Sequence, residues 1–143
     1  METKLLEIQS AEVLLTAGRM KAAGCRLVQI LCTKVESGLE LTYSFDKDYE
    51  LTNVRCLVPE GEGILSITGQ YWYAFLWENE MHDLFGLRVE LIAPEVDYKG
   101  KFFRLAKDTP WNCGKPAADQ VPNLRSGLGV GASVQQAGGE QNG

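Results

Sequence analysis

The sequence predicts an α+β domain in which an N-terminal helix precedes an antiparallel β-meander and a second helix packs on the sheet. Three observations support this. Apolar residues recur at helical spacing over 11–23, they alternate with polar residues over 39–46, and the stretch 71–85 again has helical character. The length of 143 residues suits one domain with one core. An extended C-terminal tail completes the expected architecture.

The first helix is expected over roughly 11–23, with Ser10 as its N-cap and Gly24 ending it in a left-handed conformation. The next stretch, 25–32, is almost continuously apolar. Such a run is typical of a strand covered on both faces, so we expect a central strand there.

The meander continues with the clearest strand of the chain, because apolar and polar residues alternate strictly over 39–46. A further strand is expected over 49–58. Its apolar phase shifts between Leu51 and Val54, and a bulge near Asn53 would account for the shift.

After a Pro- and Gly-rich break, a short strand is expected over 64–67 and a helix over 71–85, which Gly86 ends. A last short strand follows over 88–92. We place the boundary of the folded domain at residue 105. The tail, 106–143, is rich in Gly, Ala, Gln and Ser from about residue 115, so we expect it to be extended or disordered on its own.

Composition excludes several classes of function. The net charge of -5 argues against a nucleic-acid partner, and mildly against attachment to anionic lipid by charge alone. The start of the chain lacks a secretory-signal pattern, and no apolar run reaches the roughly 20 residues that cross a bilayer. The four cysteines form no Cys-x-x-Cys pair, so we expect free thiols in a reducing cytoplasm.

The helix expected over 71–85 is unusual because its carboxylates lie among bulky apolar side chains on both sides. Buried carboxylates need partners. Candidate partners within the chain are Arg88, Arg104 and Lys99, and arginines or backbone amides of another protein are candidates outside it. The alternative is a surface pair between Glu78 and His82, one turn apart, with the aromatic residues in the core.

Chemistry on this helix is poorly supported. Glu78, His82 and Asp83 could be metal ligands, but His82 is the only histidine and no second cluster completes the set. Glu78 and Glu80 are two residues apart and point in nearly opposite directions, which excludes a paired acid and base.

The stretch Glu78-Asn79-Glu80-Met81-His82-Asp83-Leu84-Phe85-Gly86 resembles the signature of the 30-kilodalton-subunit family of respiratory NADH dehydrogenase, complex I. The matching residues are Glu78, Glu80, Asp83, Leu84, Phe85 and Gly86, and we call the helix that carries them the signature helix. Asn79 replaces an arginine of the family, and the arginine-rich His-Pro stretch that usually follows is missing. With Asp-Tyr-Lys-Gly at 97–100, the chain is most similar to the matching subunit of membrane-bound energy-converting nickel–iron (NiFe) hydrogenases.

The resemblance implies a non-catalytic structural subunit in the cytoplasmic arm of such a hydrogenase. The subunit would be peripheral at the cytoplasmic face of the cell membrane and held there only through its partners. It would contact the large catalytic and small iron–sulfur subunits and bind no cofactor itself, because the NiFe centre and the iron–sulfur clusters belong to those partners. The implied interface residues are Glu78, Glu80, His82, Asp83, Phe85, Gly86 and Arg104.

Two alternatives stay open. One is the equivalent subunit of an NADH–quinone oxidoreductase or of a formate- or carbon-monoxide-linked complex. The other, from a different class, is a stand-alone metal-binding module that uses Glu78, His82 and Asp83.

Overall fold

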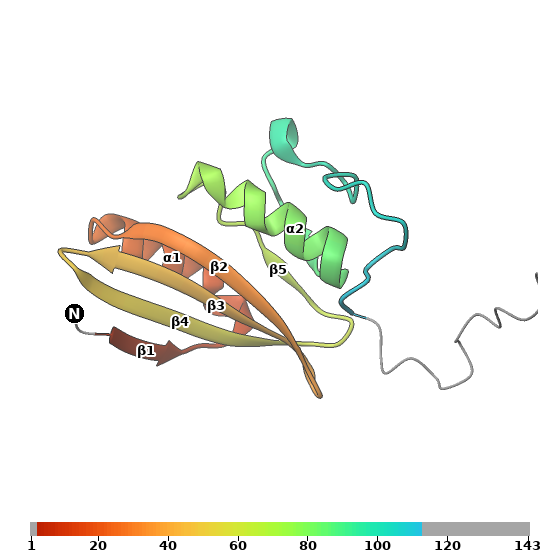
Figure 1. The fold of residues 1–143 in the computed structure, drawn as a ribbon. Helices are drawn as coiled ribbons and strands as arrows, with labels where there is room; N and C mark the ends of the chain where they lie inside the picture. The colour runs from red at the N-terminus through yellow and green to blue at the C-terminus, as the bar shows by residue number, and fades with distance from the viewer. Residues whose placement is uncertain (1–2, 113–143) are drawn as a thin grey trace, which may run out of the picture. The chain divides into compact units, whose positions relative to one another are not determined.

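The computed structural model describes residues 3–112, which form an α+β domain, as predicted (Figure 1). Its strands are β1 (Thr3–Glu7), β2 (Arg26–Val35), β3 (Gly38–Lys47), β4 (Glu50–Pro59), β5 (Gly63–Leu65) and β6 (Arg88–Glu90). Its helices are α1 (Val13–Ala22) and α2 (Phe75–Phe85), with 3-10 turns η1 (Ser10–Glu12), η2 (Trp72–Ala74) and η3 (Pro94–Val96).

The main sheet has the strand order β1-β4-β3-β2. Strands β2, β3 and β4 form the predicted antiparallel meander. Strand β1 was not predicted, and it pairs with β4 in parallel, with Thr3 opposite Leu51. All five residues of β1 are exposed, so the strand carries no apolar alternation, and its backbone hydrogen bonds hold it on the sheet.

The expectation that 25–32 forms a central strand is wrong, because β2 lies at the edge of the sheet. Leu31 points to the outer face, away from the helices, and is 54% exposed. The apolar run therefore does not mean that both faces are buried. Leu27 and Ile30 join the core, whereas Val28 and Leu31 are exposed. The bulge near Asn53 is also wrong: β3 and β4 keep one register throughout, and the irregularity falls in β2 between Leu27 and Gln29.

Helix α1 lies against one face of the sheet and contributes Val13 and Ala17 to the core (Figure 1). Ser10 is not its N-cap, because the chain enters through the turn η1, where the Glu12 carboxylate accepts the backbone N–H of Gln9 at 2.9 Å. Gly24 follows the helix with a φ of 80°, as predicted for a left-handed terminus.

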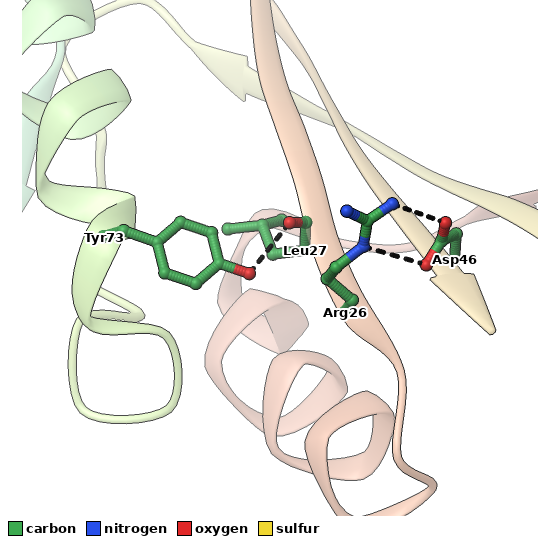
Figure 2. A network of polar contacts seen from close by, with 4 residues as sticks. All are labelled: Arg26, Leu27, Asp46 and Tyr73. Carbon is green, nitrogen blue, oxygen red and sulfur yellow. Dashed lines mark hydrogen bonds and ion pairs between the residues drawn. The ribbon is translucent and has the colours of Figure 1, made fainter.

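The segment that leads into α2 is fixed to the beginning of β2. The hydroxyl of Tyr71 donates to the carbonyl oxygen of Cys25, and that of Tyr73 to the carbonyl oxygen of Leu27, each at 2.8 Å. Figure 2 shows the Tyr73 bond beside the two-pronged ion pair of Arg26 with Asp46, whose shorter contact is 2.7 Å. Helix α2 thus lies beside the edge strand, and its residues Met81, Leu84 and Phe85 extend the core.

Gly86 ends α2 in the left-handed conformation, as predicted, with a φ of 71°. Beyond the proposed boundary at residue 105, the Trp111 backbone N–H donates to the carbonyl oxygen of Leu84 at 2.9 Å. The ring of Trp111 also meets that of Phe85, with centroids 5.5 Å apart. The rest of the predicted tail, and Cys113, lie outside the described residues, so the boundary stays a prediction.

Core packing predicts a contrast between two leucines on opposite faces of the sheet. Leu41 of β3 is fully buried and Leu57 of β4 is 41% exposed. Replacing Leu41→Ala should lower the free energy of unfolding by about 2–5 kcal/mol, because it leaves a cavity. The matched change Leu57→Ala should cost about 0.5 kcal/mol or less. Urea denaturation of both variants measures this, and a large loss for Leu57→Ala would show that the outer face is covered in solution.

Candidate functional site

Helix α2 buries three polar side chains that belong to, or lie within, the signature. Glu78 is 0% exposed, Asn79 1% and Asp83 4%. Buried polar groups of this kind are kept only when hydrogen bonds replace their lost hydration. The partners of these three residues therefore define what the helix does.

Glu78 holds the loop between β5 and η2. Its Oε1 accepts the backbone N–H of Ile67 at 2.8 Å, and its Oε2 accepts the hydroxyl of Ser66 at 2.6 Å. The hydroxyl oxygens of Ser66 and Thr68 lie 2.8 Å apart, and Thr68 accepts the backbone N–H of Ala93 at 3.3 Å. Burial raises the pKa of Glu78, although its two hydrogen bonds oppose the rise.

Asn79 and Asp83, one turn apart, hold a second segment that runs alongside α2 after β6 (Figure 1). The Asn79 amide donates to the carbonyl oxygens of Phe75 and Val96, each at 2.8 Å, and its oxygen accepts the Tyr98 backbone N–H at 3.1 Å. Asp83 Oδ2 accepts the Phe103 backbone N–H at 2.7 Å. The backbone of 96–103 is therefore tied to the helix at two levels.

The candidate ionic partners within the chain are wrong, because Glu78 and Asp83 bond to neutral donors instead. Arg88 pairs with Glu90 at 3.1 Å, and neither Lys99 nor Arg104 forms an ion pair within residues 3–112. The alternative surface pair of Glu78 with His82 is also wrong. Glu78 faces the β5–η2 loop, and His82 Nδ1 lies 2.9 Å from the carbonyl oxygen of Leu87.

Four of the seven residues expected at an interface line one surface groove of about 810 Å³: His82, Asp83, Gly86 and Arg104. Asp83 Oδ1 is buried and has no hydrogen-bond partner in the described part of the chain. The other three lie elsewhere. Glu78 is bonded to the β5–η2 loop, and the ring of Phe85 meets that of Trp111. Burial raises the pKa of the Cys32 thiol to about 12, with smaller contributions from Cys56 and from the half-buried Glu80.

Two glycines let the chain close around this groove. A Cβ on Gly86 would approach Thr109 Cγ2 to 3.0 Å, and one on Gly100 would approach His82 Nε2 to 3.3 Å. Both residues have positive φ, 71° and 81°, which other residues rarely adopt. Side chains at these positions would therefore strain the backbone and crowd the groove.

Sequence reasoning missed the donors that face α2. The backbone amides of Ile67, Tyr98 and Phe103 leave no mark in the sequence, because every residue except proline carries one. The hydroxyls of Ser66 and Thr68, two residues apart just before the helix, were a usable signal. Asn79 stood out only as a departure from the family pattern.

The described residues contain no group of three or more His, Cys, Asp and Glu side chains that could hold a metal ion. Glu78 and Asp83 bind different loops, so the trio with His82 does not converge on one point. Within the same part of the chain, no helix is long and apolar enough to cross a membrane.

The fold and the site thus define an α+β domain whose central helix anchors two loops through buried polar side chains. No protein-family model and no curated protein matches the sequence. The structure is similar to a chain in the structure of the membrane-bound sulfane sulfur reductase, an archaeal respiratory membrane complex, with a TM-score of 0.57 and 18% sequence identity. The match covers 63% of this chain and 58% of the other, and at this identity it establishes a shared fold.

The raised pKa of Glu78 predicts a pH-dependent stability. The folded state holds the proton more tightly than the unfolded chain, whose ordinary pKa is 4.5. The contribution of Glu78 is therefore fully present below pH 4.5 and is lost as the pH rises through the folded pKa. Relative to Glu78→Gln, the wild type should lose stability over that interval, by at most about 1.4 kcal/mol per pH unit.

Urea denaturation from pH 4 to 8 measures this difference. Glutamine can keep both contacts, because its oxygen can accept from Ile67 and its amide can donate to Ser66. The control Glu95→Gln removes an exposed carboxylate, so its free energy of unfolding should still fall with rising pH, as that of the wild type does. Parallel curves for wild type and Glu78→Gln would contradict the prediction.

Two separate anchors predict local effects along 96–103. Asn79→Ala leaves the Val96 carbonyl and the Tyr98 amide without their partner. Hydrogen exchange at the Tyr98 amide should then accelerate about tenfold or more, because an unmade buried hydrogen bond costs about 1–3 kcal/mol. The Phe103 amide, which Asp83 holds, serves as the internal control and should stay protected. Equal acceleration at both amides would show that the segment opens as one unit.

Proposed function

We propose that this chain is a non-catalytic assembly subunit in the cytoplasmic arm of a membrane-bound energy-converting NiFe hydrogenase. Its partners would be the large catalytic subunit and the small iron–sulfur subunit, which carry the NiFe centre and the iron–sulfur clusters. In such a complex, ferredoxin oxidation drives hydrogen evolution and ion translocation. The chain would reach the membrane only through its partners.

The observation that carries the proposal is the shared fold with a chain of an archaeal respiratory membrane complex. The likeness was found from the structure, whereas the resemblance to the complex I and hydrogenase subunits rests on the residues Glu78–Gly86. The two lines of support are therefore largely independent. Both favour a subunit of a multi-component redox complex.

The geometry of α2 supports an assembly role over catalysis. Glu78 and Asn79 are engaged in positioning backbone of their own chain, which is what a scaffold requires. The same contacts present the segment 98–107 on the surface, next to the groove that contains Asp83 and Arg104. A subunit that must offer a fixed surface to neighbours benefits from such anchoring, because less freedom is lost on binding.

The matched structure favours one further candidate, a subunit of a sulfur-reducing membrane complex, since the matched chain belongs to a membrane-bound sulfane sulfur reductase. The NADH–quinone oxidoreductase and the formate- or carbon-monoxide-linked complexes remain alternatives. The missing His-Pro stretch counts against the first of these.

The decisive experiment is affinity purification of the tagged chain from detergent-solubilised native membranes, with metal analysis of the eluate. Nickel and abundant iron, together with several co-purifying subunits, are expected. The untagged strain is the control for this purification. Deletion of the chain should collapse the arm and abolish hydrogen evolution. Iron without nickel would contradict the hydrogenase assignment and favour a respiratory, formate-linked or sulfur-reducing complex. A lone, metal-free monomer would contradict every complex-subunit proposal.

A further inference from the structure

The segment 98–107, which we call the basic strap, has a charge opposite to that of the rest of the protein. It contains Lys99, Lys101, Arg104 and Lys107 and no acidic residue, and it remains net positive even with the flanking Asp97 and Asp108, although the chain as a whole has a net charge of -5. All four cationic side chains are exposed, and none forms an ion pair within residues 3–112. A local cluster of unpaired positive charge on an acidic protein indicates a surface for an anionic partner.

Exposed apolar groups are interleaved with these charges. Tyr98, Phe103 and Leu105 are all exposed on the strap. The rings of Tyr98 and Phe102, and those of Phe102 and Phe103, have centroids 5.0 Å apart. Aromatic side chains and arginine are enriched at protein interfaces, where the aromatic groups supply contact area and charged groups fix register.

The strap is held in one conformation before any partner arrives. Asn79 and Asp83 bind the backbone amides of Tyr98 and Phe103, and the Lys101 amide donates to the Tyr98 carbonyl oxygen at 3.0 Å. Lys99 and Gly100 both have positive φ, 52° and 81°, in the turn where the chain passes close to His82. These bonds fix the strap from Tyr98 to Phe103 in the free chain, which lowers the entropy that binding must overcome.

The groove beside the strap carries charges of both signs. Lys101 and Arg104 line it, together with Asp83 and Asp108. Asp83 is buried and accepts the Phe103 backbone N–H through Oδ2, so it holds the strap rather than offering a contact to a partner. Lys101 and Arg104 are exposed, and they are the cations of the groove that a docked segment can reach.

We propose that the basic strap and its groove dock an extended acidic segment of a partner subunit. Carboxylates of that segment pair with Lys101 and Arg104, and its apolar groups pack on the exposed Tyr98, Phe103 and Leu105. An anionic bilayer or a nucleic acid fits less well, because either brings an extended negative surface against a chain whose net charge is -5, whereas a peptide segment meets the strap alone. This inference rests on the proposed role as a complex subunit and names the surface and partner chemistry for it.

The first test is site-specific photocrosslinking in the native complex. A photoreactive residue at Leu105, which lines the groove, is compared with one at Leu15, an exposed leucine of α1. The expected result is a crosslink from position 105 to a partner peptide that mass spectrometry identifies as rich in Asp and Glu. A crosslink from 105 to lipid, to a non-acidic peptide or to residues of this same chain would overturn the inference.

The second test reverses the charge of the strap. The tagged double variant Lys101→Glu/Arg104→Glu is purified from native membranes beside Arg19→Glu, which changes an exposed arginine on α1. Partner recovery should fall at least about tenfold for the double variant and stay unchanged for Arg19→Glu, because like charges in an interface repel. Both variants change exposed side chains, and thermal unfolding of the isolated chain checks that they fold.

The outcomes separate the two proposals. If the wild type brings down its partner subunits and the double variant does so equally well, the strap is not the docking surface and the proposed function stands. If the wild type purifies without partner subunits, the proposed function is contradicted, and the docking inference that rests on it is contradicted too. Partner loss in the double variant, with the acidic crosslink from position 105, supports both.

Discussion

The structure depends on a carboxylate that is buried without a cation. Glu78 lies in the first turn of α2 with no exposed surface, and its two oxygens are bonded to a hydroxyl and to a backbone amide. The cost of burying the charge appears as the raised pKa of the group. Its benefit is geometric, because the bonds fix the loop that contains Ser66 and Ile67. The next turn of chain then places Tyr71 and Tyr73, whose hydroxyls attach it to the edge strand β2.

A second side of α2 is arranged in the same way. Asn79 and Asp83 bind backbone amides of the segment after β6, so one short helix fixes the chain on both of its flanks. Glu78 and Asp83 bond to neutral donors, and the lysines and arginine of the basic strap remain unpaired among the described residues. An arginine in place of Asn79 would bring its own charge to this position. With asparagine there, the contact to the strap is made through its backbone alone, and the side chains of the strap are left to face outward.

These features suit a subunit whose task is to present a surface. The proposed role as a complex subunit draws on the fold shared with a chain of an archaeal respiratory membrane complex and on the resemblance at Glu78–Gly86. In such assemblies a non-catalytic subunit must hold a fixed shape at the contact with its neighbours, and pre-ordering of the contact segment favours association. The open outer face of the sheet, with Leu5, Leu31 and Leu57 exposed, leaves further apolar surface on the described part of the chain.

The sequence by itself determined the elements that have a period or a terminator of their own. Strict alternation identified β3, helical spacing identified α1, and Gly24 and Gly86 ended their helices in the left-handed region that glycine tolerates. It also identified α2 as the helix that needs partners, together with the residues His82, Asp83, Gly86 and Arg104, which meet at one groove.

Tertiary structure alone decided where β2 lies in the sheet, that β1 joins it, and which groups satisfy Glu78, Asn79 and Asp83. An apolar run shows that side chains avoid water, but not whether one face or two will be covered. Strand β1 buries no side chain, and backbone amides are the same at almost every residue, so neither leaves a pattern to find. Their roles are fixed only when distant segments meet.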